Sequence, residues 1–411
     1  MDFNPSAPTV MHIDINSCFA TIEQQANPLL RGLPIAVVAY DSPRGVILAA
    51  SIEAKRFGVK TGMRLMDGRQ LVPELTVVLP DPDKYRFVHK KLNKLLSKFC
   101  SEIYPKSIDE FVLDFQSHRV ESLPAQAGSM QHVARDIKRR IEEEIGEWIT
   151  VSIGISTNRQ LAKVAAGMVK PDGLVEINGS NFRQVYKSLK LTDMHGINTR
   201  YAVRLNAVGI HTVPEFYEST LSNIEAAFRS VNAFYWYLRL RGYEVDGIEF
   251  GRKSFGNSYS IPQNLSLVRE LSPILAKLVN KTATRLRKAK YAAYGVHVAV
   301  SFKGGGFWHH GERLPQPVFY TSDIFKAAYA VLKRVRINRP VHTLSVSCYD
   351  LVEKPPLQLS MFENEEKRQF LAQAMDRVNN RFGSFVLMTG NMLAAKDAVK
   401  DRIAFGQGGI S

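Results

Sequence analysis

The run Lys106-Ser107-Ile108-Asp109-Glu110-Phe111-Val112-Leu113-Asp114-Phe115 places two adjacent carboxylates within an apolar, strand-forming stretch. An ionised carboxylate near a protein core is costly unless a positive group offsets it. Successive side chains of a strand point to opposite faces, so Asp109 and Glu110 can share one target only at a turn or a bulge. The usual target of such a pair is a divalent cation. The alternative is that one of the two is a salt-bridged strand residue.

A second acid, Asp14, ends the short apolar run that begins at Thr9, and a helical pattern starts at Phe19. Asp14 is therefore expected at the C-terminal end of a strand, which is where open α/β sheets usually bind their ligands. An Asp at a strand end is commonly only a cap. Asp14 gains significance because a second acidic cluster lies on another predicted strand.

In the first half of the chain, apolar residues recur with the spacing of a helix in some segments and with the spacing of a strand in others. Their order is strand, helix, strand, strand, helix, strand, which is typical of a split βαβ, or ferredoxin-like, core. Asp14 and Asp109-Glu110 would lie on its central strands. The expected helices are 51–58, 83–103, 130–144 and 158–166. The expected strands are 9–16, 34–39, 46–50 and 148–156, together with the acidic hairpin of residues 106–115, which follows helix 83–103.

The second half begins with a helix-turn-helix pattern over residues 191–210, which is similar to a helix-hairpin-helix that holds a DNA phosphate through backbone N–H groups. Asn198 stands where a second glycine is typical. A glycine-rich linker follows. A second α+β domain is expected next, with strands at 255–261, 295–302 and 343–349 and helices at 268–288 and 324–335.

The formal net charge is +15, and the pI is about 9.6. Residues 239–350 contain 18 Lys or Arg and 7 Asp or Glu, so most of the basic excess lies there. A solvated basic face would explain this excess, but its concentration favours a polyanionic partner, with nucleic acid ahead of an anionic membrane.

The chain has 411 residues, which is too many for one ordinary domain. No apolar stretch is long enough to cross a bilayer, and the N-terminus has no basic and apolar signal region, so we expect no membrane association. Cys18, Cys100 and Cys348 are widely spaced. This spacing argues against a disulfide framework or a zinc site and favours a reducing cytoplasm.

An extended peptide, Leu357-Gln358-Leu359-Ser360-Met361-Phe362, follows two prolines near the C-terminus. Such a peptide could enter an apolar pocket of a partner protein. The alternative is a strand edge that packs on its own domain.

Four motifs together resemble the Y-family translesion DNA polymerases. They are Asp14 to Glu23, Ser107-Ile108-Asp109-Glu110, Ala162-Lys163 and Lys170-Pro171-Asp172-Gly173. The resemblance implies an α+β, multidomain right-hand fold with a ferredoxin-like palm, small fingers, a helical thumb containing the helix-hairpin-helix and a separate α/β little finger. The expected boundaries are palm 1–17 and 84–175, fingers 18–83, thumb 176–240, linker 241–251, little finger 252–350 and tail 351–411.

The resemblance also implies template-directed, error-prone translesion synthesis in DNA damage tolerance and the SOS response, in the bacterial cytoplasm and at the nucleoid during repair. Two Mg²⁺ ions, for which Mn²⁺ can substitute, would be bound by the catalytic carboxylates of Asp14, Asp109 and Glu110 and by the Ile15 carbonyl. One ion would lower the pKa of the primer 3′-hydroxyl, and the other would neutralise the triphosphate.

Further residues match binding positions of the family. Lys55 and Lys163 match phosphate-contacting positions, and Phe19 matches the steric gate that rejects ribonucleotides. Primer–template DNA would be contacted by Gly196, Ile197, Lys253 and Ser254. The sliding clamp would bind Gln358, Leu359, Met361 and Phe362.

Within the family, Ser51 to Lys55, Arg252 to Gly256 and the tail resemble the polymerase V branch, which implies an accessory protein and a recombinase filament as partners. The chain departs from the family at Ile52, Lys55, Cys18 and Phe111, and Phe111 could crowd the acidic pair. A non-catalytic scaffold for DNA and clamp is the main alternative, but it would have lost the three carboxylates. A nucleotide cyclase would have no use for a basic second domain.

Overall fold

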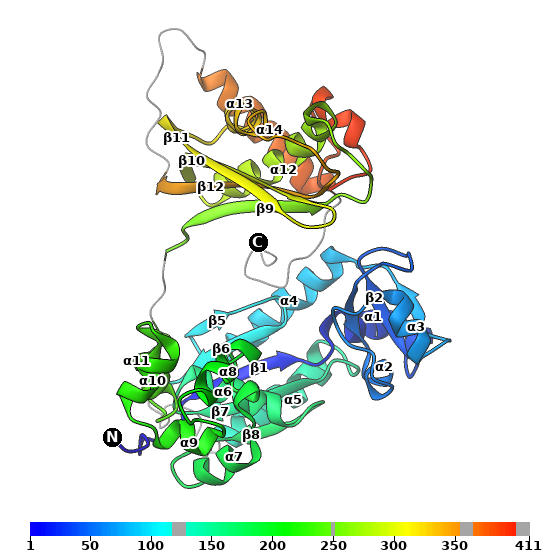
Figure 1. Cartoon of the computed structure of the whole chain (residues 1–411). Coiled ribbons are helices and arrows are strands. Elements are labelled where there is room, and N and C mark those ends of the chain that lie inside the picture. The colour runs from blue at the N-terminus through cyan, green and yellow to red at the C-terminus, as the bar shows by residue number, and fades with distance from the viewer. Residues whose placement is uncertain (117–128, 248–250, 354–364, 400–411) are drawn as a thin grey trace. The chain divides into compact units, whose positions relative to one another are not determined.

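The computed structural model describes residues 1–116, 129–247, 251–353 and 365–399. These residues form two compact units, the first ending at residue 247 and the second beginning at residue 251 (Figure 1). None of the described helices is both long and apolar enough to cross a lipid bilayer.

A five-stranded sheet is the centre of the first unit, in the order β5-β6-β1-β7-β8. The central strand β1 is antiparallel to both β6 and β7, and β8 is parallel to β7. The strands span Val10–Ile15 (β1), Ile103–Pro105 (β5), Glu110–Asp114 (β6), Val151–Ser156 (β7) and Leu174–Glu176 (β8). The predicted α+β fold is confirmed, and Asp14 and Glu110 lie on its central strands.

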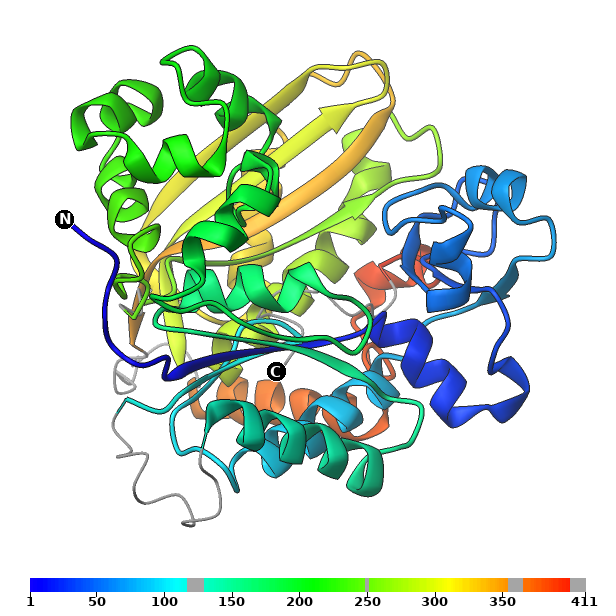
Figure 2. The same ribbon diagram turned by 90° about the horizontal axis from the view of Figure 1, so that it is seen from below.

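Side-chain alternation gives the two faces of this sheet different neighbours. Met11, Ile13 and Ile15 join the main core with helices Cys18–Ala26 (α1), Pro82–Leu96 (α4) and Met130–Glu144 (α5). His12 and Asp14 belong to the opposite face, where helix Arg159–Met168 (α6) packs against β1 and β7. In Figure 2 the sheet lies between α6 on one side and α4 and α5 on the other. The acidic side chains therefore face α6.

Two smaller clusters complete the first unit. A three-stranded sheet, in the order β3-β2-β4, packs with two short helices; it consists of Ile35–Val38 (β2), Ile47–Ala50 (β3), Ile52–Arg56 (α2), Leu65–Leu71 (α3) and Thr76–Val78 (β4). The other cluster is helical and comprises Phe182–Ser188 (α7), Thr199–Asn206 (α8), Val213–Glu218 (α9), Leu221–Phe228 (α10) and Asn232–Arg239 (α11). Short 3₁₀ turns occur at Pro28–Leu30 (η1) and Leu191–Asp193 (η3).

The predicted linker starts as part of the first unit. The Asn158 side chain caps α6 and donates to the carbonyls of Arg239 and Tyr243, at 2.9 and 3.1 Å. The Arg159 N–H donates to Glu244 at 2.8 Å. These hydrogen bonds hold residues 239–244 against the start of α6.

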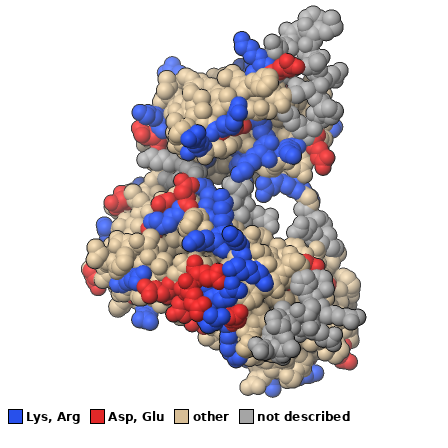
Figure 3. All heavy atoms as spheres, turned by 180° about the vertical axis from the view of Figure 1, so that it is seen from behind, with Lys and Arg blue, Asp and Glu red and all other residues tan. Residues whose placement is uncertain are grey.

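The second unit is an antiparallel sheet in the order β11-β10-β12-β9, and α12 and α13 pack against it. Its elements are Ser254–Ser260 (β9), Val268–Lys288 (α12), Tyr291–Phe302 (β10), Phe307–Val318 (β11), Thr321–Leu332 (α13), Val341–Glu353 (β12), Glu365–Phe382 (α14) and Gly390–Ala395 (η4). Figure 3 shows Lys and Arg side chains gathered over one face of this unit.

Candidate active site

Asp14 and Glu110 lie directly opposite each other where β1 pairs with β6. This register places both carboxylates on the face of the sheet that α6 covers. Because β1 is a central strand, both side chains are largely buried, with exposed fractions of 17% and 19%. The sequence prediction that two strands bring these acids together is confirmed.

Asp109 lies at the bend before β6, as the adjacency of the two carboxylates predicted. Its carbonyl accepts a hydrogen bond from the Ile15 N–H at 2.9 Å, which fixes the bend to the end of β1. Its carboxylate accepts a hydrogen bond from the Ser107 hydroxyl at 2.5 Å. Phe111 points to the opposite face and stacks on His89, so it packs below the acidic pair and does not crowd it.

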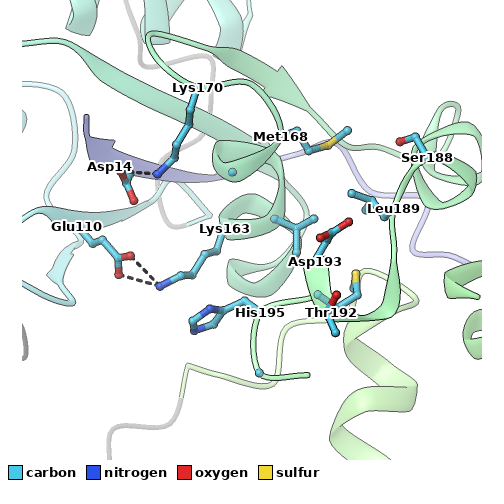
Figure 4. Close-up of a pocket in the computed structure, with 14 residues that line it drawn as sticks. Asp14, Glu110, Lys163, Met168, Lys170, Ser188, Leu189, Thr192, Asp193 and His195 are labelled. Carbon is cyan, nitrogen blue, oxygen red and sulfur yellow. Dashed lines mark hydrogen bonds and ion pairs between the residues drawn. The ribbon is translucent and has the colours of Figure 1, made fainter. Parts of the chain in front are cut away.

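Two lysines reach the carboxylates from α6 and from the loop that follows it. Lys163 Nζ contacts both carboxylate oxygens of Glu110, at 2.9 and 2.8 Å. Lys170 Nζ contacts Asp14 Oδ1 at 2.7 Å. Figure 4 shows these two ion pairs side by side. The family resemblance implies a phosphate contact for Lys163, whereas no role for Lys170 follows from the sequence patterns.

His12 is a further residue that sequence analysis missed. It precedes Asp14 by two positions on β1, and one ring nitrogen lies within 4.8 Å of carboxylate oxygens of Asp14 and Glu110. His12 is buried, and neither ring nitrogen has a hydrogen-bond partner among the described residues. Its two-residue spacing from Asp14 was the available signal, because strand alternation puts both on one face.

Burial dominates the electrostatics of the site. It raises the pKa of Asp14 against the effect of Lys170, and it raises the pKa of Asp109 against the hydrogen bond from Ser107. Burial is also the largest effect on Glu110 and acts to raise its pKa, but the hydrogen bond from Lys163 together with the charges of His12, Lys163 and His195 lowers the pKa overall. Burial also lowers the pKa of His12 to about 3, so this ring is neutral near pH 7.

These observations fit a divalent cation. Two of the three carboxylates have raised pKa values, which means that their ionised form is under-stabilised in the protein. A cation with hard oxygen ligands would correct this, and the unpaired nitrogens of His12 offer a further polar group beside it.

Two pockets meet at Asp14 and Lys170. The first, the α6 pocket, has a volume of about 720 Å³ and is lined by Glu110, Lys163 and His195 among others (Figure 4). The second, the α2 pocket, has a volume of about 540 Å³ and lies between the end of β1 and helix α2. Asp109 lines only the α2 pocket, and Glu110 lines only the α6 pocket.

The α2 pocket contains two residues that sequence analysis assigned to the nucleotide. Phe19 is fully buried and stacks on Tyr85 with a centroid distance of 4.4 Å. The pKa of Lys55, which also lines the pocket, is lowered by burial and by the charge of Lys170. Ile15, expected to offer its carbonyl to a metal, lines the same pocket.

The helix-hairpin-helix pattern corresponds to η3, a turn and α8. Gly196 has a φ of 102° and lines the α6 pocket, whereas the side chain of Ile197 is buried in the helical cluster. Asn198 caps α8 by accepting a hydrogen bond from the Tyr201 N–H at 3.0 Å. This cap explains why an Asn stands where a glycine is typical.

The remaining predicted contacts lie outside this site. Lys253 and Ser254 are exposed at the start of β9 in the second unit. Gln358, Leu359, Met361 and Phe362 fall outside the described residues.

Comparisons with known proteins agree over both units. A model of the impB/mucB/samB family matches residues 13–167, and a model of its C-terminal domain matches residues 252–361. DNA polymerase IV of Moorella thermoacetica is 32% identical over 388 residues, covering 92% of this chain and 94% of that protein. DNA polymerase IV of Alkalilimnicola ehrlichii is 31% identical over 360 residues, covering 86% of this chain and 99% of that protein.

Solved structures give the same result. A Y-family DNA polymerase chimera of Dbh and Dpo4 superposes with a TM-score of 0.72 at 26% identity, covering 84% of this chain and 99% of that chain. An insertion ternary complex of Dbh DNA polymerase gives a TM-score of 0.59 with the same identity and coverage. The curated relatives carry the name polymerase IV, so the expected assignment to the polymerase V branch is not supported.

Proposed function

The chain belongs to the Y-family of DNA polymerases and is a DNA-directed DNA polymerase, and we propose that it performs error-prone translesion synthesis in the SOS response by a two-metal mechanism. The observation that carries this proposal is the register of Asp14 against Glu110, with Asp109 at the adjoining bend. One pocket lies beside Glu110 and a second lies beside Asp109, and Asp14 lines both.

We assign roles from this geometry. Asp14, Asp109, Glu110 and the Ile15 carbonyl would hold two Mg²⁺ ions, which would lower the pKa of the primer 3′-hydroxyl and neutralise the charge of the triphosphate. The α2 pocket would receive the incoming nucleotide, with its sugar against Phe19 and its phosphates near Lys55 and Lys170. The α6 pocket would receive the primer end.

The larger elements would correspond to the domains of a right-hand polymerase. The five-stranded sheet would be the palm, the three-stranded sheet with α2 and α3 the fingers, the helical cluster α7 to α11 the thumb, and the second unit the little finger. Lys253 and Ser254 would contact the template–primer. The tail peptide 358–362 would recruit a sliding clamp, a proposal that rests on the sequence alone.

The branch within the family decides which partners are needed. The polymerase V branch, with its accessory protein and recombinase filament, rests on short motifs, whereas relatives over nearly the full length are named polymerase IV. We therefore favour a polymerase that extends primers alone. If primer extension strictly required an added recombinase filament, this result would favour the polymerase V branch.

The direct test of the metal assignment is Asp109→Ala in a primer-extension assay with Mg²⁺. Metal stabilisation is worth several kcal/mol, so extension should slow by about a thousandfold or more. Asp136→Ala is the matched control, because Asp136 lies on α5, which packs on the opposite face of the sheet from the carboxylates. The proposal fails if Asp109→Ala extends as fast as this control.

A further inference from the structure

Each carboxylate proposed to bind metal already has a partner within the chain. Lys163 contacts both oxygens of Glu110, Lys170 contacts Asp14, and the Ser107 hydroxyl donates to Asp109. Two ammonium groups therefore lie against the carboxylates to which the proposed function assigns cations. An ammonium group and a divalent cation on one carboxylate repel each other strongly at such short range.

The two lysines differ in their freedom to move away. Lys163 extends from the middle of α6, and its side chain is 24% exposed. Lys170 lies in the loop after α6, and its side chain is 42% exposed. Lys170 also lines both pockets, so its ammonium group can leave Asp14 and still face the α2 pocket.

We propose that Lys170 is an internal counterion that holds Asp14 in the metal-free protein, is displaced when a divalent cation binds, and then turns to the phosphates of the incoming nucleotide. This inference rests on the proposed function, because it takes the carboxylates as the cation site. It makes Lys170 a positioning residue that links two binding events.

Two consequences follow from this exchange. Without nucleotide, Lys170 competes with the cation and weakens its binding. With nucleotide, the displaced ammonium group gains a new anionic partner, so cation and nucleotide each strengthen the binding of the other by the same factor. A lysine that only supports the fold would produce neither effect.

The test measures Mn²⁺ binding to the purified chain without DNA or nucleotide, from the loss of the free-ion electron paramagnetic resonance signal. Lys170→Met should bind Mn²⁺ about tenfold more tightly than wild type, because a contacting charge is removed. Lys170→Arg keeps the charge and can grip Asp14 with two N–H groups, so it should bind no more tightly than wild type.

Lys55→Met is the matched control. Lys55 lines the same pocket and interacts electrostatically with Asp14 and Asp109, but no hydrogen bond or ion pair joins it to either carboxylate in the described structure. It reports the long-range effect of removing one positive charge, which salt should screen away. A Lys170→Met affinity no greater than that of Lys55→Met overturns the inference.

A second measurement repeats the titration with a non-hydrolysable deoxynucleoside triphosphate, and the signal lost to the nucleotide alone is subtracted because a triphosphate itself binds Mn²⁺. Wild type should gain more Mn²⁺ affinity than Lys170→Met, and an equal gain overturns the coupling. Asp14→Ala distinguishes a failure of the proposed cation site from a failure of the role given to Lys170. If this variant binds Mn²⁺ like wild type, the proposed cation site itself is wrong; if it loses binding while Lys170→Met behaves like Lys55→Met, only the role of Lys170 is wrong. Thermal unfolding confirms that each variant is folded.

Discussion

Phe19 is fully buried and yet lines the α2 pocket, so one ring both packs the core and borders the proposed sugar site. Tyr85 stacks on the Phe19 ring and donates a hydrogen bond to Glu23 at 2.7 Å. This hydrogen bond fixes the Tyr85 ring, which in turn holds Phe19 in place. If Phe19 is the proposed steric gate, its ring would exclude a 2′-hydroxyl because it cannot move further into the core.

The gate predicts a change in sugar selection. Phe19→Ala would leave a cavity and cost about 3–5 kcal/mol of stability, so Phe19→Leu is the more informative variant. It should lower the preference for deoxynucleotides by about tenfold or more, measured as the ratio of kcat/KM for the two sugars. Tyr85→Phe keeps the stack and should preserve the preference. An unchanged ratio in Phe19→Leu would remove Phe19 as the gate.

His89 supports the bend from the core side, with Nδ1 3.0 Å from the Ile108 carbonyl. Burial lowers the pKa of His89, and this hydrogen bond acts in the opposite direction. Below the ordinary histidine pKa of about 6.5, the unfolded chain takes up a proton that the folded chain resists. The stability that His89 contributes is therefore present above this pH and lost as the pH falls below it.

The corresponding measurement is the thermal unfolding midpoint at about pH 7.5 and about pH 5.5. Wild type should be less stable at the lower pH, and His89→Gln should show a smaller decrease. Equal decreases in the two proteins would contradict the role given to His89.

Among the helices and strands, sequence patterns predicted the bounds best for elements that bury one face and expose the other. The helices Met130–Glu144 and Val268–Lys288 begin and end at the predicted residues, because amphipathic spacing marks both. The predicted helix 83–103 ends at Leu96. Strand Phe307–Val318 was missed because it is an exposed edge strand with two prolines and little apolar alternation.

The site was predictable only in part for a related reason. The acids could be found because they stand out in apolar strands. The contacts of Lys170 and His12 depend on strand register and on the path of the loop after α6, which local patterns do not encode. Strand alternation was enough to suggest His12, but it gives no sign that both ring nitrogens lack partners.

The hairpin before α8 gives a prediction at this scale. Gly196 and Gly209 both have positive φ values, 102° and 82°, so alanine at either position should cost about 1–3 kcal/mol. Only Gly196 lines the α6 pocket. Gly196→Ala should therefore weaken primer–template binding, measured by fluorescence anisotropy, more than Gly209→Ala does. Equal affinities would show that the hairpin does not contact DNA.

At the scale of the whole molecule, the chemistry and the charge are divided between the two units. All the proposed metal ligands lie in the first unit, and the segment with the largest basic excess forms most of the second. This division suits an enzyme that carries out its chemistry in one unit and binds a polyanion with the other. The family matches cover parts of both units.

The most direct measurement is primer extension with Mg²⁺ across a template abasic site, comparing wild type with Glu110→Gln, a variant of nearly the same size without the charge. We expect wild type to extend past the abasic site and the variant to lose this extension while still binding primer–template. Equal extension by both proteins, or wild-type extension that always stops at the abasic site, would contradict a translesion polymerase centred on these carboxylates.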